Sequence, residues 1–132
     1  KITRSDDIDI FKKLISHTIK YANGFDIHKL ENGNYLSLAG LKIKSKYKAV
    51  GHSDGDVVLH SIIDALLGAN SQGDIGLYFP ALKKYKNISS VILLNKIKNI
   101  IKLNRIIIIN LDCTIICQKI SSSKYLYYIL QI

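Results

Sequence analysis

The sequence predicts an α+β fold, a two-layer sandwich in which a mixed β-sheet carries helices on one of its faces. The apolar residues of two segments, 56–67 and 91–103, recur at the spacing of an α-helix. Those of two others, 35–43 and 105–118, form the alternating or continuous apolar runs of β-strands. The order strand, strand, helix, helix, strand, helix then gives one sheet layer and one helix layer.

Length and composition limit the class of protein. The chain has 132 residues, 48% of them hydrophobic, which is enough for one domain with its own core. Its formal net charge of +9 permits nucleic-acid binding, an anionic substrate, or a codon bias towards lysine. Two cysteines make no secreted disulfide scaffold, and the apolar runs fall short of the roughly 18 residues that span a membrane.

We divide the chain into an N-terminal extension, residues 1–18, and a domain, residues 19–132. The extension is predicted to contain a short helix. Residues 19–28 are predicted to form a strand. Because strand side chains alternate between two faces, Asp26 and His28 would point the same way.

Two glycine-containing positions indicate where the backbone turns. Gly24 marks a bend or a close approach of another segment. Residues 32–34, Asn-Gly-Asn, are typical of a turn, after which 35–43 is predicted to be a strand paired with its predecessor. The lysines that follow every second residue are expected to face solvent (Lys42, Lys44, Lys46, Lys48).

The chain is organised around a histidine- and acid-rich loop that leads into the first long helix. Ser53 followed by Asp56 resembles a capping box, with Asp where Glu or Gln is usual. Residues four apart share a helix face, so Asp56, His60 and Asp64 would form one polar stripe. Gly68 is expected to end the helix.

The next segments connect the two long helices. Residues 73–76 are predicted to form an acidic loop flanked by glycines, and residues 81–87 are basic and expected to be exposed. Ser89 or Ser90 is predicted to cap the second long helix.

The region from 105 to 118 is the strongest strand candidate. Its run Ile106–Ile109 predicts a central strand buried on both faces. Cys113 and Cys117 are expected to be buried free thiols, because a zinc site would need further ligands. A final short helix is predicted within residues 121–130.

Three side chains have the right chemistry for a divalent metal. Asp26 and His28 come from one strand, and His60 comes from the following helix. Two imidazoles and one carboxylate bind zinc and leave a fourth tetrahedral position open for water or substrate, where the metal acts as a Lewis acid. Asp64, one turn beyond His60, would then orient a ligand ring.

Other interpretations stay open at this point. Each histidine can be a satisfied polar residue of a packed fold. A basic nucleic-acid-binding module is also possible, since Tyr and Lys alternate around 44–48 and 124–128. A serine hydrolase is disfavoured, because sequence neighbours rarely meet in triad geometry (His52, Ser53, Asp54).

Several motifs occur in the order typical of one enzyme family, from about residue 19 to 118. The sequence resembles the 2-C-methyl-D-erythritol 2,4-cyclodiphosphate synthase family. The matching motifs are Gly24-Phe25-Asp26-Ile27-His28, Gly40, His52-Ser53-Asp54-Gly55-Asp56-Val57-Val58-Leu59-His60, Asp64-Ala65-Leu66-Leu67-Gly68-Ala69, Gly73-Asp74-Ile75-Gly76, Phe79-Pro80 and Leu111-Asp112-Cys113-Thr114-Ile115-Ile116-Cys117-Gln118.

The resemblance implies a lyase of non-mevalonate isoprenoid synthesis. Its substrate would be 4-diphosphocytidyl-2-C-methyl-D-erythritol 2-phosphate, whose 2-phosphate attacks the β-phosphorus and expels CMP to close a cyclic diphosphate. The resemblance also implies a homotrimer with active sites between subunits and one zinc ion per subunit. A Mg²⁺ or Mn²⁺ ion would accompany the substrate diphosphate, and neither a nucleic acid nor a membrane would be a partner.

Residue roles follow from the resemblance by position. Zinc would be held by Asp26, His28 and His60, and His52 would stabilise the transition state. Asp56 and Asp64 would support the site by capping and orienting. The substrate would contact Asp26, His28, His52, Ser53, Asp74, Ile75, Gly76, Phe79, Pro80, Cys117, Gln118 and Lys119.

The chain departs from the family pattern in three places. Ala81–Lys83 stands where the family has an acidic loop, and Lys119–Ser121 lacks an Ala-Pro-Lys-like turn. The C-terminal Thr-Thr-x-Glu motif, which grips phosphates, is absent. We therefore expect that the sequence omits segments near 80–81 and 119–120 and a tail; an intact mass near 14.8 kDa would refute this. A chain that ends at Ile132 would be a catalytically impaired metal-binding relative.

Localisation follows from weaker features of the sequence. The codon bias, the extra N-terminal segment and the resemblance favour an apicoplast-type plastid, reached through a leader removed upstream of Lys1. A bacterial cytoplasm is the alternative.

Overall fold

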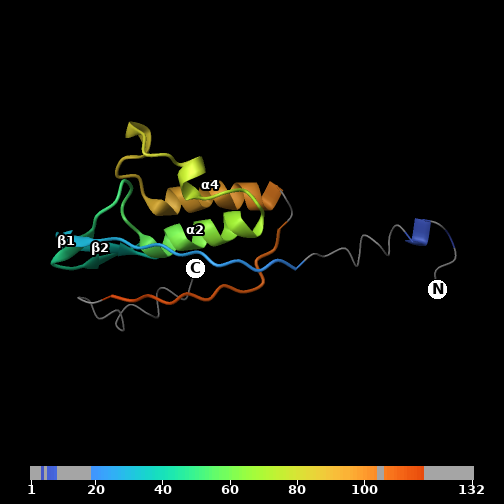
Figure 1. Cartoon of the computed structure of the whole chain (residues 1–132), viewed down its shortest axis with the longest axis horizontal. Helices are drawn as coiled ribbons and strands as arrows, with labels where there is room; N and C mark the ends of the chain where they lie inside the picture. The colour runs from blue at the N-terminus through green and yellow to red at the C-terminus, as the bar shows by residue number, and fades with distance from the viewer. Residues whose placement is uncertain (1–3, 5, 9–18, 104–105, 118–132) are drawn as a thin grey trace.

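The computed structural model describes residues 4, 6–8, 19–103 and 106–117. Figure 1 shows the two long helices stacked together, the small strands gathered at one end of them, and long extended segments running beneath α2 (Val57–Ala69). In chain order the elements are β1 (Leu30–Asn32), β2 (Tyr35–Leu38), β3 (Leu41–Lys44), β4 (Tyr47–Ala49), α2 (Val57–Ala69), α3 (Ile75–Tyr78), a 3₁₀ turn η1 (Lys83–Tyr85) and α4 (Ser90–Leu103). The predicted final helix, 121–130, lies outside these residues, as does most of the predicted helix in 1–18.

The four strands form two antiparallel ladders. β1 pairs with β4, and β2 pairs with β3 in a hairpin that sets Leu36 opposite Ile43. Side chains alternate along β3 and β4, so that the four lysines at 42, 44, 46 and 48 are exposed, as predicted. The α+β class is confirmed, whereas the sheets within the described ranges are antiparallel rather than mixed.

The prediction of one strand over 35–43 was wrong. The backbone reverses at Ala39 and Gly40, whose φ angles are 51° and 81°, as a tight two-residue hairpin turn requires. Asp56 explains why an alanine accepts this conformation. Its carboxylate accepts hydrogen bonds from the N–H groups of Ala39, at 2.9 Å, and Gly40, at 2.7 Å.

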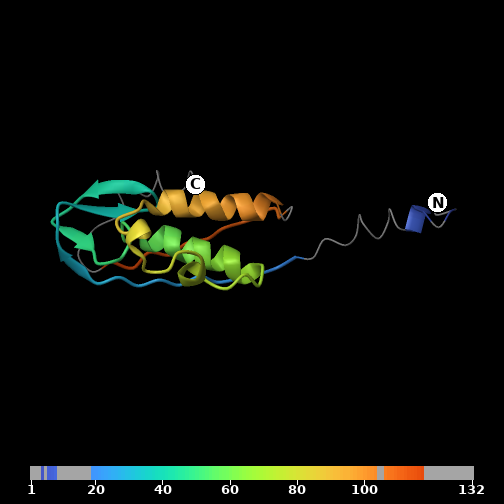
Figure 2. The same cartoon turned by 90° about the horizontal axis from the view of Figure 1, so that it is seen from above.

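The two long helices occur where their periodicity predicts them. α2 begins one residue later and ends two residues later than expected, so Gly68 lies inside it and Asn70 caps it. The prediction of a Ser53–Asp56 capping box was wrong. Asp56 itself is the N-cap, and its carboxylate accepts a hydrogen bond from the N–H of Leu59 at 3.1 Å. Seen from above, α2 and α4 lie side by side (Figure 2).

The core lies between the helical layer and the β2–β3 hairpin. Its members are apolar side chains that are less than a tenth exposed: Leu36, Leu38, Ala39, Ile43, Val58, Leu59, Ile62, Ile63, Leu67, Leu93, Leu94, Ile97 and Ile101. Every buried side-chain nitrogen or oxygen in the part of the chain that the structure describes has a hydrogen-bond partner. Among the helices described, none combines the length and apolar character needed to cross a bilayer.

Two segments predicted as strands are extended without strand pairing in the described residues. They are 19–29 and 106–117, which run beneath α2 in Figure 1 and line one groove of about 680 Å³. The prediction that Ile106–Ile109 is buried on both faces was wrong, since Ile107 is 82% exposed and Ile109 80%. No neighbouring strand or second layer covers them among the described residues.

The two cysteines lie on the second of these segments and are not disulfide-bonded. Cys113 is exposed and Cys117 half-buried, so the expectation of buried thiols was wrong. The reason is the same as for the isoleucines, because the segment lies on the surface rather than at the centre of a sheet.

Candidate metal centre

The first two candidate ligands lie on the extended segment 19–29. Burial alternates along it, so Asp26 and His28 face the protein while Phe25 and Ile27 are exposed. The segment is pressed against α2 at Gly24, where a Cβ atom would lie 1.7 Å from the carbonyl oxygen of Ser61. Gly24 is therefore a close approach, as its sequence position predicted.

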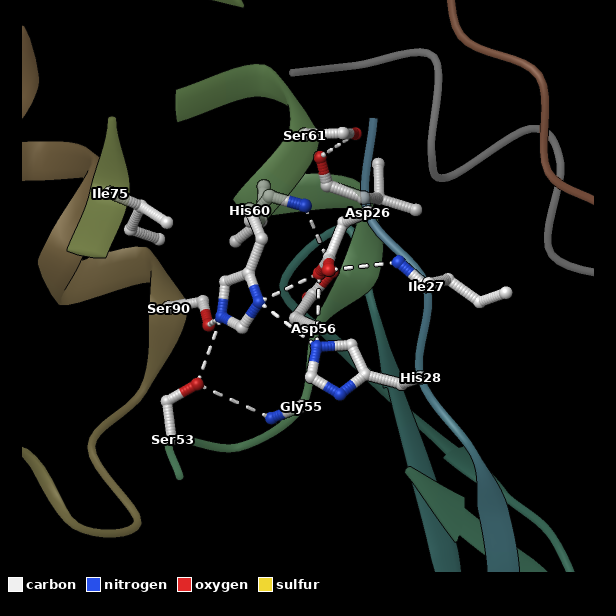
Figure 3. Close-up of polar contacts among 12 residues, drawn as sticks. Asp26, Ile27, His28, Ser53, Gly55, Asp56, His60, Ser61, Ile75 and Ser90 are labelled. Carbon is white, nitrogen blue, oxygen red and sulfur yellow. Dashed lines mark hydrogen bonds and ion pairs between the residues drawn. The ribbon is translucent and has the colours of Figure 1, made fainter. Parts of the chain in front are cut away.

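The third candidate ligand, His60, lies in the first turns of α2 and is 9% exposed. Its Nδ1 atom lies 2.9 Å from Oδ2 of Asp26, which is also 2.9 Å from Nε2 of His28. The two ring nitrogens are 3.3 Å apart. One ligand atom from each residue thus falls within 4.8 Å of the others, and Figure 3 shows the three side chains converging.

The far side of each ring is anchored to the protein. Nδ1 of His28 donates to the carbonyl oxygen of Val50 at 2.5 Å. Nε2 of His60 lies 2.9 Å from the hydroxyls of both Ser53 and Ser90. Metal-bound histidines are held in this way, with one ring nitrogen on the metal and the other on a protein acceptor. The donor set and its outer partners fit a zinc ion.

The charges of the site stabilise one another. Burial alone would raise the pKa of Asp26, but hydrogen bonds from His28 and His60 and the attraction of their charges bring it well below its usual range. The hydrogen bond to Asp26 raises the pKa of His28; burial opposes the rise and the Val50 carbonyl adds to it. The cluster therefore favours a negative carboxylate beside a positive ring, a charge balance that a cation would replace.

Two residues of the site escaped the sequence reasoning. Ser90 lies at the start of α4 and is 0% exposed, with its hydroxyl between His60 and Asp54. Asp54 accepts from the Ser90 hydroxyl at 2.5 Å and from the Ser90 backbone N–H at 3.0 Å. A serine thirty residues from its partner carries no spacing signal, and only the Asp54 of the histidine-rich motif could have pointed to it.

Asp56 and Asp64 were predicted to support the site. Asp56 is fully buried and caps α2, as already described. Burial raises its pKa, and the three backbone N–H groups that it accepts oppose that rise. Asp64 was expected to orient a ligand ring, and this was wrong, since its carboxylate accepts from the N–H of Ile75 at 2.7 Å. It ties α3 to α2 instead.

The other predicted contacts lie in three places. The ring of His52, an exposed residue, donates to the carbonyl oxygen of Leu82 at 2.8 Å. Asp74 caps α3 by accepting from Leu77, and α3 carries the predicted Ile75 and Gly76. Phe79 packs edge-on against Tyr85, with ring centroids 5.5 Å apart, and Pro80 follows it, exposed. Of the predicted substrate contacts, only Asp26, His28 and Cys117 line the groove. Gln118 and Lys119 lie outside the described residues.

The comparisons with known proteins agree with one another. A model of the YgbB family matches residues 19–131. A relative from Clostridium botulinum (strain Hall), named 2-C-methyl-D-erythritol 2,4-cyclodiphosphate synthase, is 49% identical over 107 residues, or 80% of this chain and 67% of the relative. The "Bifunctional enzyme IspD/IspF" of Campylobacter hominis is 45% identical over 127 residues, or 95% of this chain and 34% of the relative.

Solved structures give the same result. One titled "Structure of 2C-Methyl-D-erythritol-2,4-cyclodiphosphate Synthase" superposes with a TM-score of 0.60 at 39% identity over 65% of this chain. The bifunctional IspDF from Campylobacter jejuni superposes with a TM-score of 0.58 at 40% identity, over 63% of this chain and 23% of that one. The chain spans 58% of the first of these structures. On sequence and structure together, the chain belongs to the YgbB family.

Proposed function

We propose that this chain is a 2-C-methyl-D-erythritol 2,4-cyclodiphosphate synthase. It converts 4-diphosphocytidyl-2-C-methyl-D-erythritol 2-phosphate to the 2,4-cyclodiphosphate and CMP in non-mevalonate isoprenoid synthesis. The observation that carries the proposal is the convergence of Asp26, His28 and His60 within 4.8 Å, in a chain 49% identical to a relative of that name.

The three converging side chains would hold one zinc ion. When bound, the ion would supply Lewis-acid chemistry to a phosphate oxygen of the substrate. Asp26 also accepts from its neighbour's N–H, at Ile27, which keeps one carboxylate oxygen turned towards both rings (Figure 3). The chain thus presents a preorganised set of ligands, with the outer nitrogens of both imidazoles already paired.

The reaction needs no nucleophilic side chain, because the substrate supplies its own. An oxygen of the 2-phosphate forms a bond to the β-phosphorus, and the bond from that phosphorus to the bridging oxygen breaks. CMP leaves with the bridging oxygen and the electron pair. Positioning and charge neutralisation are then the main sources of acceleration. His52 and Ser53 lie in the histidine-rich loop before α2 and contact the 2-phosphate. His52 stabilises the transition state.

The remaining substrate contacts come from three segments. Asp74, Ile75 and Gly76 hold the erythritol hydroxyls, with Phe79 and Pro80 beside them, and Cys117, Gln118 and Lys119 begin the cytidine site. The link between Asp64 and Ile75 supports this arrangement, because Asp64 is one helical turn from His60 and therefore brings α3 near the metal ligands. Mg²⁺ or Mn²⁺ accompanies the diphosphate.

A homotrimer with active sites between subunits completes the proposal. The exposed apolar side chains on the two extended segments support it, because monomers rarely leave contiguous apolar surface uncovered. Phe25 is 80% exposed, Ile27 78% and Ile116 92%. In the trimer these segments become strands of a mixed sheet in a two-layer sandwich. The two relatives described above are bacterial, which supports a bacterial cytoplasm and does not support localisation in a plastid.

The decisive experiment is CMP release from the substrate by the purified protein, whose intact mass and zinc content are measured on the same sample. We expect about one zinc per chain and CMP release that a chelator abolishes. Lys44→Ala, an exposed position on β3, is the matched control and should leave both unchanged. Zinc without CMP release would show a catalytically impaired relative. Salt-sensitive RNA binding without zinc would replace the proposal with a nucleic-acid-binding module.

A further inference from the structure

Asp54 and Ser90 form a hydrogen-bonded pair behind the buried ring of His60. We propose that this pair is the built-in acceptor for a proton on Nε2 of His60, which is the form that the ring takes when a metal binds Nδ1. Asp54 and Ser90 are then positioning residues of the metal centre. The inference rests on the proposed zinc site and adds to it the groups that favour the metal-binding form of one ligand.

The ring of His60 lies between two groups of partners. On one side, Nδ1 is 2.9 Å from the carboxylate of Asp26 and 3.3 Å from His28. On the other side, Nε2 is 2.9 Å from the hydroxyls of Ser53 and Ser90. The Asp26 carboxylate can only accept, so without a metal Nδ1 donates to it. A metal on Nδ1 takes the place of that proton, and the neutral ring then carries its one proton on Nε2. The metal-bound ring therefore needs a hydrogen-bond acceptor at Nε2.

The direction of that bond is set by Asp54. A hydroxyl has a single proton, and Oδ1 of Asp54 lies 2.5 Å from the Ser90 oxygen. A carboxylate accepts hydrogen bonds and has none to give, so the Ser90 proton points to Asp54. Because Ser90 is 0% exposed, solvent offers its hydroxyl no alternative. Only lone pairs of Ser90 are left facing His60, so Ser90 can accept a hydrogen bond from Nε2 but cannot donate one.

Ser53 lies at the same distance from Nε2 but cannot set the tautomer. Its hydroxyl accepts a long hydrogen bond, 3.4 Å, from the N–H of Gly55, which leaves its own proton free to turn either way. Ser53 can therefore donate to the ring or accept from it. The two serines thus provide a matched pair. Their hydroxyls are equally far from Nε2, and the difference between them is the Asp54 carboxylate that accepts the proton of Ser90.

A purely structural role for Asp54 makes a different prediction. Asp54 also accepts from the backbone N–H of Ser90 at the start of α4, which is the contact of a helix cap. Asn caps helices about as well as Asp, so Asp54→Asn would preserve that role. Its amide oxygen would go to the Ser90 N–H, and its NH₂ group would donate to the Ser90 hydroxyl. The hydroxyl would then turn its proton to Nε2 of His60 and oppose the proton that the metal-bound ring carries there.

The test has two readouts, the ring proton and the metal affinity. In zinc-loaded protein labelled with ¹⁵N-histidine, we expect the Nε2 proton of His60 to exchange slowly with solvent in the unmodified protein and faster in Asp54→Asn. Zinc affinity, measured by competition with a chelator, should fall about 10–100-fold in Asp54→Asn.

Two further variants control for folding and for simple polarity. Ser90→Ala removes the acceptor and should also weaken zinc binding about tenfold while leaving Asp54 its backbone partner. Ser53→Ala should leave the exchange of the Nε2 proton and the zinc affinity unchanged. The proposal fails if Asp54→Asn, or Ser90→Ala should Asp54→Asn not fold, keeps both at the level of the unmodified protein. It also fails if Ser53→Ala matches Ser90→Ala. Absence of CMP release by the unmodified protein would count against the proposed function only, since both readouts need zinc and no substrate.

Discussion

The polar cluster around His60 and the apolar groove beneath α2 are built in opposite ways. In the cluster each ring nitrogen of His28 and His60 has a protein partner. Hydrogen bonds of Asp54, Ser90 and Asp26 join the histidine-rich loop, α4 and the extended segment 19–29 to His60 on α2. The groove is bordered by segments 19–29 and 106–117, which have no strand partner in the described residues. The protein is therefore rigid on one side of its candidate metal centre and open on the other.

Asp26 and His28 belong to both regions, because they contact His60 in the cluster and also line the groove. His60 is fixed by a buried helix, whereas Asp26 and His28 are held by side-chain contacts, by the close approach at Gly24, and by one backbone hydrogen bond, from Val50 to Lys29 at 2.9 Å. A metal ion would join the rigid half to the open half. Four changes break or sharpen this contrast, and we order them by expected effect.

The largest effect is expected from His60→Ala, which removes the ligand held by the rigid half. Zinc affinity should fall by more than about 100-fold, beyond the loss caused by changing an outer partner. Zinc content after desalting, measured by elemental analysis, checks this. Unchanged zinc content would refute the role assigned to His60.

Asp56→Ala should weaken the rigid half itself. The N–H groups of Ala39, Gly40 and Leu59 would lose their common acceptor. Because each buried, unpaired donor costs about 1–3 kcal/mol, we expect unfolding in urea to cost about 3–5 kcal/mol less. Asp64→Ala is the matched control, since it removes one half-buried bond to Ile75 and should cost about 1 kcal/mol. Equal losses in the two variants would contradict the role of Asp56.

Gly24→Ala should loosen the open half and spare the helices. The new Cβ atom would meet the Ser61 carbonyl of α2, and overpacking of this kind costs about 1–3 kcal/mol. The segment that carries Asp26 and His28 should move away from α2, lowering zinc affinity while helical circular dichroism is kept. Gly68→Ala is the control, since nothing lies within 4 Å of its Cβ position and the helix should gain about 0.5–1 kcal/mol. Zinc affinity that stays level in Gly24→Ala would contradict this docking.

The smallest effect is a pH dependence of the metal-free protein. His28 has a raised pKa, so its contribution is complete below its ordinary 6.5 and is lost as the pH rises through the folded-state value. Asp26 has a lowered pKa, so its contribution is complete above 3.8 and is lost as the pH falls. The pair should therefore add most, about 1 kcal/mol, between these two pH values.

Melting temperature against pH, compared with Asp26→Asn, isolates the contribution of this pair. Zinc should reverse the trend at high pH, because metal and proton compete for the same nitrogens. A metal-free protein whose melting temperature keeps the same pH profile after Asp26→Asn would show that the pair contributes nothing.

The sequence predicted the elements whose residues determine their own conformation. Both long helices follow from apolar periodicity and serine or aspartate caps, and their ends differ by two residues or fewer. The hairpin turn was missed because Ala39 adopts a positive φ only with the help of Asp56, seventeen residues away. The strands over 19–28 and 105–118 were overpredicted. An apolar run indicates that a segment can be buried, but it does not identify a neighbouring strand that would pair with it.

The candidate metal ligands could be predicted from the sequence, whereas the residues that hold them in place could not. Asp26, His28 and His60 are residue types with strong metal chemistry at a strand-like and helical spacing, so composition and period suffice to group them. Ser90 is chemically ordinary, and its importance comes from its burial between Asp54 and His60. Asp64 was assigned to the wrong partner because helical spacing places it near His60 without showing that Ile75 is nearer.

The carboxylate of Asp56 also has a kinetic consequence. It joins the Ala39–Gly40 turn to the start of α2 across only about seventeen residues, whereas Asp26 and His60 are thirty-four apart. Short loops close at lower entropic cost, so we expect the hairpin and α2 to form the folding nucleus. The strand-like segment with Asp26 and His28 would dock last. Zinc added during refolding should then slow unfolding and leave the rate of the first folding step unchanged.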